Sequence, residues 1–152
     1  RFPGPGPWRI RFDARRGADR VRVERTVAVA EAAPCEIARA ACVRPLGGGA
    51  VLTLELSPRP PRAMRELQLE AALARGGEPI DGAEVSVSFA MPGMEMGPNR
   101  VALKPAGSGR YRGQAVVVRC PSGRRDWTAE VEVRLPGGAE PWRGAFPLAV
   151  AE

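Results

Sequence analysis

The 152-residue sequence contains no histidine, a single lysine at Lys104, and few aromatic side chains, which make up 5% of the chain. Without histidine, the commonest general base and the commonest zinc ligand are missing, so histidine-dependent catalytic triads are excluded. A blue-copper site is also excluded, because it requires two imidazole ligands. No apolar run is long enough to cross a bilayer as a helix. The remaining composition, 44% hydrophobic and 26% charged, is typical of one globular domain with or without an extension.

The formal net charge of +6 suggests an anionic partner, but the distribution of charge argues against nucleic acid. The arginines are scattered and often alternate with acidic residues, as in "RVRVERTV" at residues 20–27. Nucleic-acid binders usually concentrate basic residues and interleave them with aromatic side chains, which are scarce here. We therefore expect a solvated basic surface and no nucleic-acid partner.

From about residue 50 onward, apolar and polar residues alternate with a period of two, which predicts half-buried antiparallel strands. The segment 63–77 also permits an amphipathic helix. It lies within a run of strands and follows three prolines, so we predict a strand there as well. Glycine- and proline-rich turn signals separate the predicted strands. The seven strands cover residues 50–56, 66–74, 84–91, 101–104, 110–118, 127–135 and 144–150.

This pattern predicts an all-β fold, an immunoglobulin-like antiparallel β-sandwich of about seven strands, over residues 46–152. Residues 1–45 differ from the rest and are interpreted as an N-terminal extension. Within it, residues 8–14 and 21–30 alternate well and predict a hairpin around "RRGADR", whereas the alanine-rich stretch near residue 35 is compatible with a short helix. We expect the extension to pack on the sandwich or to pair with one of its edges.

Three cysteines, Cys35, Cys42 and Cys120, cannot all pair within one chain. We favour a disulfide between Cys42 and Cys120, which would tie the extension to the sandwich and contribute about 4 kcal/mol by chain entropy. The local pair Cys35–Cys42 and a fully reduced set remain open. Any bridge implies an oxidising compartment, such as the periplasm or the cell exterior.

Three of the four methionines, Met91, Met94 and Met96, lie within six residues of one another. Thioether sulfur is a soft donor that suits copper(I), and Met94 and Met96 point to the same side if they lie on a strand. Gly93 allows the chain to fold back, so that Met91 can supply a third sulfur, and Cys120 is a candidate fourth ligand if it is not bridged. These four residues form the predicted metal site.

Structural interpretations of the same residues remain open. Met91 continues the buried alternation of the preceding strand, which favours a core role over a ligand role, and Met64 is interpreted as core too. Met94 and Met96 suit irregular packing or an adaptable protein-contact surface. The acidic pairs Glu78 with Asp81 and Asp126 with Glu130 are interpreted as surface charges. We find no catalytic residue set and expect no enzymatic activity.

Residues 65–135 contain, in this order, the segments "GEPIDGAEV", "MEMG", "GRYRG" and "SGRRDW". By the order and spacing of these segments, the region resembles the FixH/YtkA-like group of extracytoplasmic domains. It implies an immunoglobulin-like fold in the periplasm or outside the cell, often tethered to the membrane, and a link to copper handling. Met94 and Met96 stand where the family has a methionine pair. The absence of histidine departs from relatives with methionine plus histidine and limits the expected ion to copper(I).

The sequence and the resemblance together predict a non-enzymatic copper(I)-binding accessory protein, with copper(I) as the only expected cofactor and a membrane protein or copper enzyme as partner. No small-molecule substrate is evident, and the chain itself carries no transmembrane segment; anchoring would require a segment outside it. The competing hypothesis is a metal-free interaction or structural domain of a membrane complex, which would dock through a sandwich edge or the methionine loop.

Overall fold

The computed structural model describes residues 6–29, 35–94, 97 and 99–152, with the side chains at 6–8 and 28–29 left aside. The chain divides into two compact units, Arg1–Ala33 and Pro34–Glu152. The described residues form β-strands and no helix, which confirms the predicted all-β class. The second unit begins at Pro34 and not at residue 46, because Ile37 is fully buried in the sandwich core. Residues 36–40, where a short helix was an option, form a turn.

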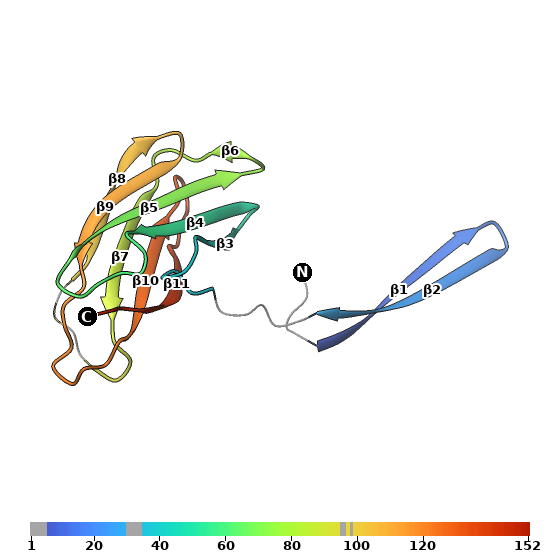
Figure 1. Ribbon diagram of the computed structural model, residues 1–152. Helices are drawn as coiled ribbons and strands as arrows, with labels where there is room; N and C mark the ends of the chain where they lie inside the picture. Colours follow the sequence, from blue (N-terminus) through green and yellow to red (C-terminus); the bar gives the residue numbers. More distant parts are fainter. Residues whose placement is uncertain (1–5, 30–34, 95–96, 98) are drawn as a thin grey trace. The chain divides into compact units, whose positions relative to one another are not determined.

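The first unit contains an antiparallel hairpin of β1 (Gly6–Arg16) and β2 (Asp19–Val29) (Figure 1). The strands pair without a register shift, from Gly6 opposite Val29 to Arg16 opposite Asp19. Gly17 has a φ of 61°, as glycine adopts at the first central position of a type II′ hairpin turn. The hairpin thus surrounds the "RRGADR" segment as the alternation predicts.

The second unit is a sandwich of antiparallel strands (Figure 1). Seven of its strands correspond to the seven predicted segments, and residues 66–75 form a strand as expected. The two others are short: β3 has six residues, with Val43 exposed and Arg44 half-buried, and β6 has two. The strands are β3 (Cys42–Gly47), β4 (Ala50–Ser57), β5 (Glu66–Arg75), β6 (Glu78–Pro79), β7 (Glu84–Ala90), β8 (Val101–Gly107), β9 (Arg110–Val116), β10 (Asp126–Arg134) and β11 (Trp142–Ala149).

Strand β8 connects the two layers of the sandwich. Neighbouring strands follow the order β11-β10-β7-β8-β9-β5-β4-β3, and β6 pairs with β5. The first half of β8, Val101 to Leu103, pairs with β7, and its second half pairs with β9. The change of partner falls between Leu103 and Lys104, and a register shift follows between Pro105 and Gly107. A strand that changes sheets in this way makes a corner of the sandwich, as an irregularity or bulge allows.

The core lies between the layers and is built from the apolar positions of each alternating strand. Leu52, Leu54 and Leu56 of β4 are at most 2% exposed, and the intervening residues face outward. Burying each such side chain contributes about 1.5–3 kcal/mol. The largest fully buried side chains are Tyr111, Phe146, Ile37, Leu52, Leu54, Leu56, Leu67, Leu69, Leu73, Met91, Val87 and Val117.

Two of the sequence motifs hold one another at one end of the core. The Tyr111 hydroxyl donates to the Ile80 carbonyl at 2.8 Å and accepts from the Ala83 amide at 3.0 Å. The Asp81 carboxylate accepts from the Gly109 amide at 2.8 Å. The segments "GEPIDGAEV" and "GRYRG" therefore satisfy polar groups of one another. Asp81 is exposed, as expected for a surface charge, and it also holds the turn between β8 and β9.

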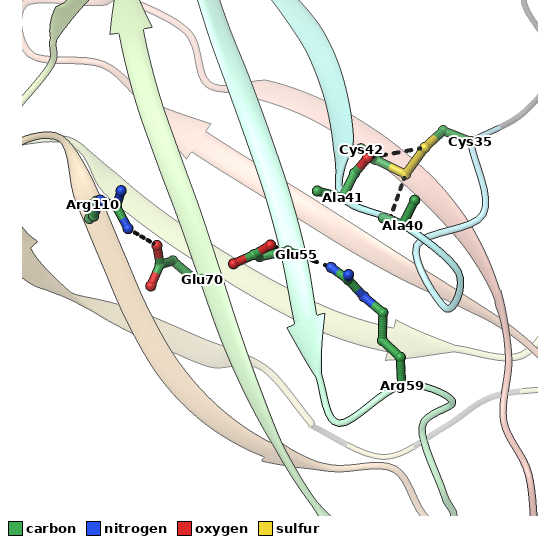
Figure 2. A network of polar contacts seen from close by, with 8 residues as sticks. All are labelled: Cys35, Ala40, Ala41, Cys42, Glu55, Arg59, Glu70 and Arg110. Carbon is green, nitrogen blue, oxygen red and sulfur yellow. Dashed lines mark hydrogen bonds and ion pairs between the residues drawn. A yellow bond between two sulfur atoms is a disulfide. The ribbon is translucent and has the colours of Figure 1, made fainter.

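The disulfide joins Cys35 to Cys42, with the Cα atoms 5.8 Å apart, so the favoured Cys42–Cys120 bridge is wrong. A turn, in which the Arg39 amide donates to the Glu36 carbonyl at 3.0 Å, brings Cys35 back beside the start of β3. Figure 2 shows the bridge next to Ala40 and Ala41, whose carbonyl oxygens lie 3.8 Å from its sulfurs. The local pairing leaves Cys120 as a free, buried cysteine.

The outer face of β4, β5 and β9 is covered by charged pairs. In Figure 2, Glu55 pairs with Arg59 at 3.4 Å and Glu70 with Arg110 at 2.6 Å. Such exposed pairs keep the face solvated and add little stability. Among the described residues no helix is long and apolar enough to span a membrane.

Candidate functional site

Two tight turns face each other beyond the ends of β7 and β9. In the first, the Met94 amide donates to the Met91 carbonyl at 3.0 Å, and Gly93 has a φ of 79°, which fits a type II turn with proline at its first central position. In the second, the Gly123 amide donates to the Cys120 carbonyl at 3.0 Å. The first turn presents Met94 and the second presents Cys120.

The two turns bring two sulfur atoms together. Cys120 Sγ lies 3.8 Å from Met94 Sδ. The Cys120 side chain is nearly buried, at 4% exposed, whereas Met94 is 40% exposed and forms the solvent side of the pair. A thiol and a thioether in contact, with one of them open to water, form a soft donor pair.

The surroundings of Cys120 favour the thiolate. Ser122 Oγ lies 3.0 Å from Cys120 Sγ, and this hydrogen bond, with a smaller contribution from the Arg124 charge, lowers the pKa of the Cys120 thiol despite the opposing effect of burial. Because the thiolate is the form that binds metals, the lowered pKa makes Cys120 a better ligand at neutral pH.

Arg124 fastens the two turns to each other. Its Nη1 donates to the Pro92 carbonyl at 2.9 Å, while Nε and Nη2 donate to the Asp126 carboxylate at 3.1 and 2.5 Å. The guanidinium is thus held by a two-point contact with Asp126 at the start of β10 and reaches across to the methionine turn. Asp126 serves as the anchor of this arginine.

Of the other two predicted ligands, the structure describes Met91. Met91 is 2% exposed and packs in the core, as its place in the alternation of β7 indicates. Met96 lies outside the described residues. Met64, interpreted as core from the sequence, is 61% exposed in the turn before β5. The structure therefore brings together Met94 and Cys120 of the predicted set.

Sequence reasoning missed Asn99, which positions the methionine turn. Its side-chain oxygen accepts from the Phe89 amide at 3.1 Å, and its amide group donates to the Phe89 carbonyl. Asn99 therefore replaces a strand partner at the end of β7, beyond the last β7–β8 pair at Val87 and Val101. The only signal in the sequence was the "GPN" turn, which does not reveal the contact.

A surface hollow of about 530 Å³ lies on the outer face of β7, β10 and β11, away from the sulfur pair. Its central carboxylate, Glu132, accepts from Arg100 at 2.8 Å and from Arg143 at 2.9 Å, and these arginines lower the pKa of Glu132. The charges of the hollow neutralise one another, so we assign it no ligand.

Among the described residues no group of three or more cysteine or carboxylate side chains is placed to hold a metal.

Comparison with known proteins supports the resemblance seen in the sequence. Residues 49–118 match the family model described as YtkA-like. A crystal structure of a DUF4785 family protein from Legionella pneumophila is similar with a TM-score of 0.48 and 16% identity, covering 69% of this chain and 29% of that chain. This chain thus spans less than a third of that protein, and a search of curated proteins gives no significant match. The family match, together with the sandwich that carries it, assigns residues 49–118 to the YtkA-like family.

Proposed function

We propose that this protein is a non-enzymatic extracytoplasmic module that binds copper(I) through Met94 and Cys120. The observation that supports the proposal is the 3.8 Å contact between the two sulfurs, which come from different loops. A thioether and a thiolate are the donors that soft monovalent copper prefers over harder ions. The free state of Cys120 and its lowered pKa agree with a ligand role.

The donor pair passes a simple test of size. With metal–sulfur bonds of about 2.3 Å, as for zinc thiolates, two sulfurs on one ion lie at most about 4.6 Å apart. The observed separation of 3.8 Å falls within this limit, so both sulfurs can reach one ion. When bound, copper(I) would bring soft Lewis acidity and one-electron redox chemistry.

The unequal exposure of the two ligands favours transfer over storage. The buried Cys120 is held by its hydrogen bond with Ser122, whereas the side chain of Met94 is 40% exposed to solvent. A partner that approaches from the solvent meets the thioether first and can exchange its own ligand for it. The Cys35–Cys42 disulfide and the YtkA-like family are consistent with an extracytoplasmic location, where disulfides persist.

A copper(I) competition titration against a chromogenic chelator tests the proposal. The reductant must keep copper monovalent and leave the disulfide intact, which a count of one free thiol per chain verifies. We expect one copper(I) per wild-type chain and loss of competition in the Met94→Leu/Cys120→Ser double variant. A Met96→Leu variant tests the part of the prediction that comes from the sequence alone.

Met64→Leu is the matched control, because Met64 is a more exposed methionine and is not one of the two proposed ligands. This variant should bind copper(I) as the wild type does. If wild type fails to compete, or if the Met94→Leu/Cys120→Ser variant competes equally well, the copper proposal is wrong. The methionine turn would then be a packing or docking element.

A further inference from the structure

The β1–β2 hairpin has one apolar and one polar face. Cross-strand partners share a face, and the pairs Phe12 with Val23 and Ala14 with Val21 place these side chains together. Ile10 and Val27 follow on the same face by alternation, and Arg25, the partner of Ile10, is a charged residue within it. The opposite face carries two ion pairs, Arg11 with Glu24 at 2.7 Å and Arg22 with Asp13 at 2.8 Å.

The apolar face of the hairpin is open to solvent. Phe12 is 61% exposed, Val21 59% and Val23 44%. A two-stranded hairpin is marginally stable in water unless another surface covers its apolar face. A cluster of exposed valines around a phenylalanine therefore indicates a surface that binds something apolar.

The charge of the hairpin indicates what that surface is. Strands β1 and β2 and their turn carry seven arginines and three carboxylates, a net charge of +4. At the turn, Arg15 lies directly opposite Arg20, a like-charge pair that destabilises a hairpin in isolation. A second copy would bring two hairpins of +4 together, whereas an anionic surface would neutralise the charge.

An anionic phospholipid bilayer matches both properties. Its hydrocarbon accepts the apolar face, and its phosphates attract arginines, whose long side chains extend from the rim of a two-stranded element to the headgroups. Basic amphipathic helices bind membrane surfaces by this combination of apolar burial and charge. We infer that the β1–β2 hairpin is a peripheral membrane-binding element that lies on anionic lipid through Phe12, Val21 and Val23. This inference does not depend on the copper proposal.

The test is co-sedimentation of the full chain with vesicles of phosphatidylglycerol and phosphatidylcholine, compared with phosphatidylcholine alone. We expect binding to the anionic vesicles only, weakened by added salt. Phe12→Ser/Val23→Ser should weaken binding at least ~10-fold, because it removes a directly opposed apolar pair. Val116→Ser, at a valine on β9 that is 51% exposed, is the matched control and should bind as wild type.

A second variant guards against simple unfolding of the hairpin. Arg15→Gln/Arg20→Gln removes the like-charge pair, so it should stabilise the hairpin and still weaken vesicle binding about 30-fold, because two charges are lost. Failure of wild type to bind anionic vesicles, or equal binding by Phe12→Ser/Val23→Ser, would overturn the inference.

Two further results would assign the apolar face to another occupant and would also overturn the inference. A wild-type dimer that Phe12→Ser/Val23→Ser converts to monomer would show that a second copy covers the face. A lower urea midpoint for unfolding of the sandwich in Phe12→Ser/Val23→Ser would show that the chain's own sandwich covers the apolar face.

Discussion

Gly109 is packed against the backbone at the end of β5. A Cβ atom at this position would lie 2.4 Å from the Leu73 carbonyl oxygen, and the φ of Gly109 is 68°. Gly107 in the same turn has a φ of 84°, but a Cβ there would meet nothing within 4 Å. Substituting alanine at each of the two glycines therefore distinguishes the free-energy cost of a left-handed backbone from that of a steric clash.

We predict that Gly107→Ala lowers the free energy of unfolding by about 1–2 kcal/mol, the cost of a left-handed conformation for alanine. Gly109→Ala should cost about 2 kcal/mol more, because the Leu73–Gly109 backbone contact must also move. Urea unfolding followed by circular dichroism measures both. Equal losses in the two variants would show that the close contact at Gly109 is unimportant.

Single residues were the least predictable part of the candidate site. The burial of Met91 followed from alternation, but the exposure of Met64 did not, because Met64 adopts a φ of 60° in an irregular turn where periodicity carries no information. The contact of Met94 with Cys120 joins residues 26 positions apart on two loops. The sequence pattern indicated both residues as ligands, but it did not predict that their two turns lie against each other.

At the scale of elements, period-two alternation predicted seven strands of the sandwich, because each of them buries one face in a shared core. It did not predict β3, where Val43 is exposed and Arg44 is half-buried, or β6, which has only two residues. The pairing of three cysteines was beyond sequence reasoning, because spacing alone does not reveal that residues 36–40 turn back on themselves.

The Cys35–Cys42 bridge should stabilise the start of β3. It closes a loop with a sequence separation of 7, for which chain entropy gives about 2.5 kcal/mol. We predict that Cys35→Ser/Cys42→Ala lowers the free energy of unfolding by about this amount, measured by urea denaturation. Cys120→Ser should leave a strong dependence of stability on added reductant, whereas the double variant should have none. If reductant does not destabilise the wild type, the bridge contributes no stability.

At the scale of the whole molecule, composition and alternation predicted a sandwich preceded by an extension, and the all-β immunoglobulin-like class is confirmed. The sequence predicts that the sandwich domain begins at residue 46, whereas the two units divide between Ala33 and Pro34. The reason is that residues 35–42 have no alternation, yet Ile37 and the disulfide belong to the sandwich.

The division into two units makes the two proposed activities separable. Every core residue in the described part of the chain lies between Ile37 and Val150, so a chain of residues 34–152 retains the whole sandwich core and the disulfide. We predict that this shortened chain unfolds at the same urea concentration as the full protein and competes equally for copper(I). It should lose binding to anionic vesicles, because it lacks the hairpin, which carries the net charge of +4 and the exposed apolar face. Vesicle binding by the shortened chain would place the lipid contact on the sandwich, and a lower unfolding midpoint would show that the hairpin stabilises it.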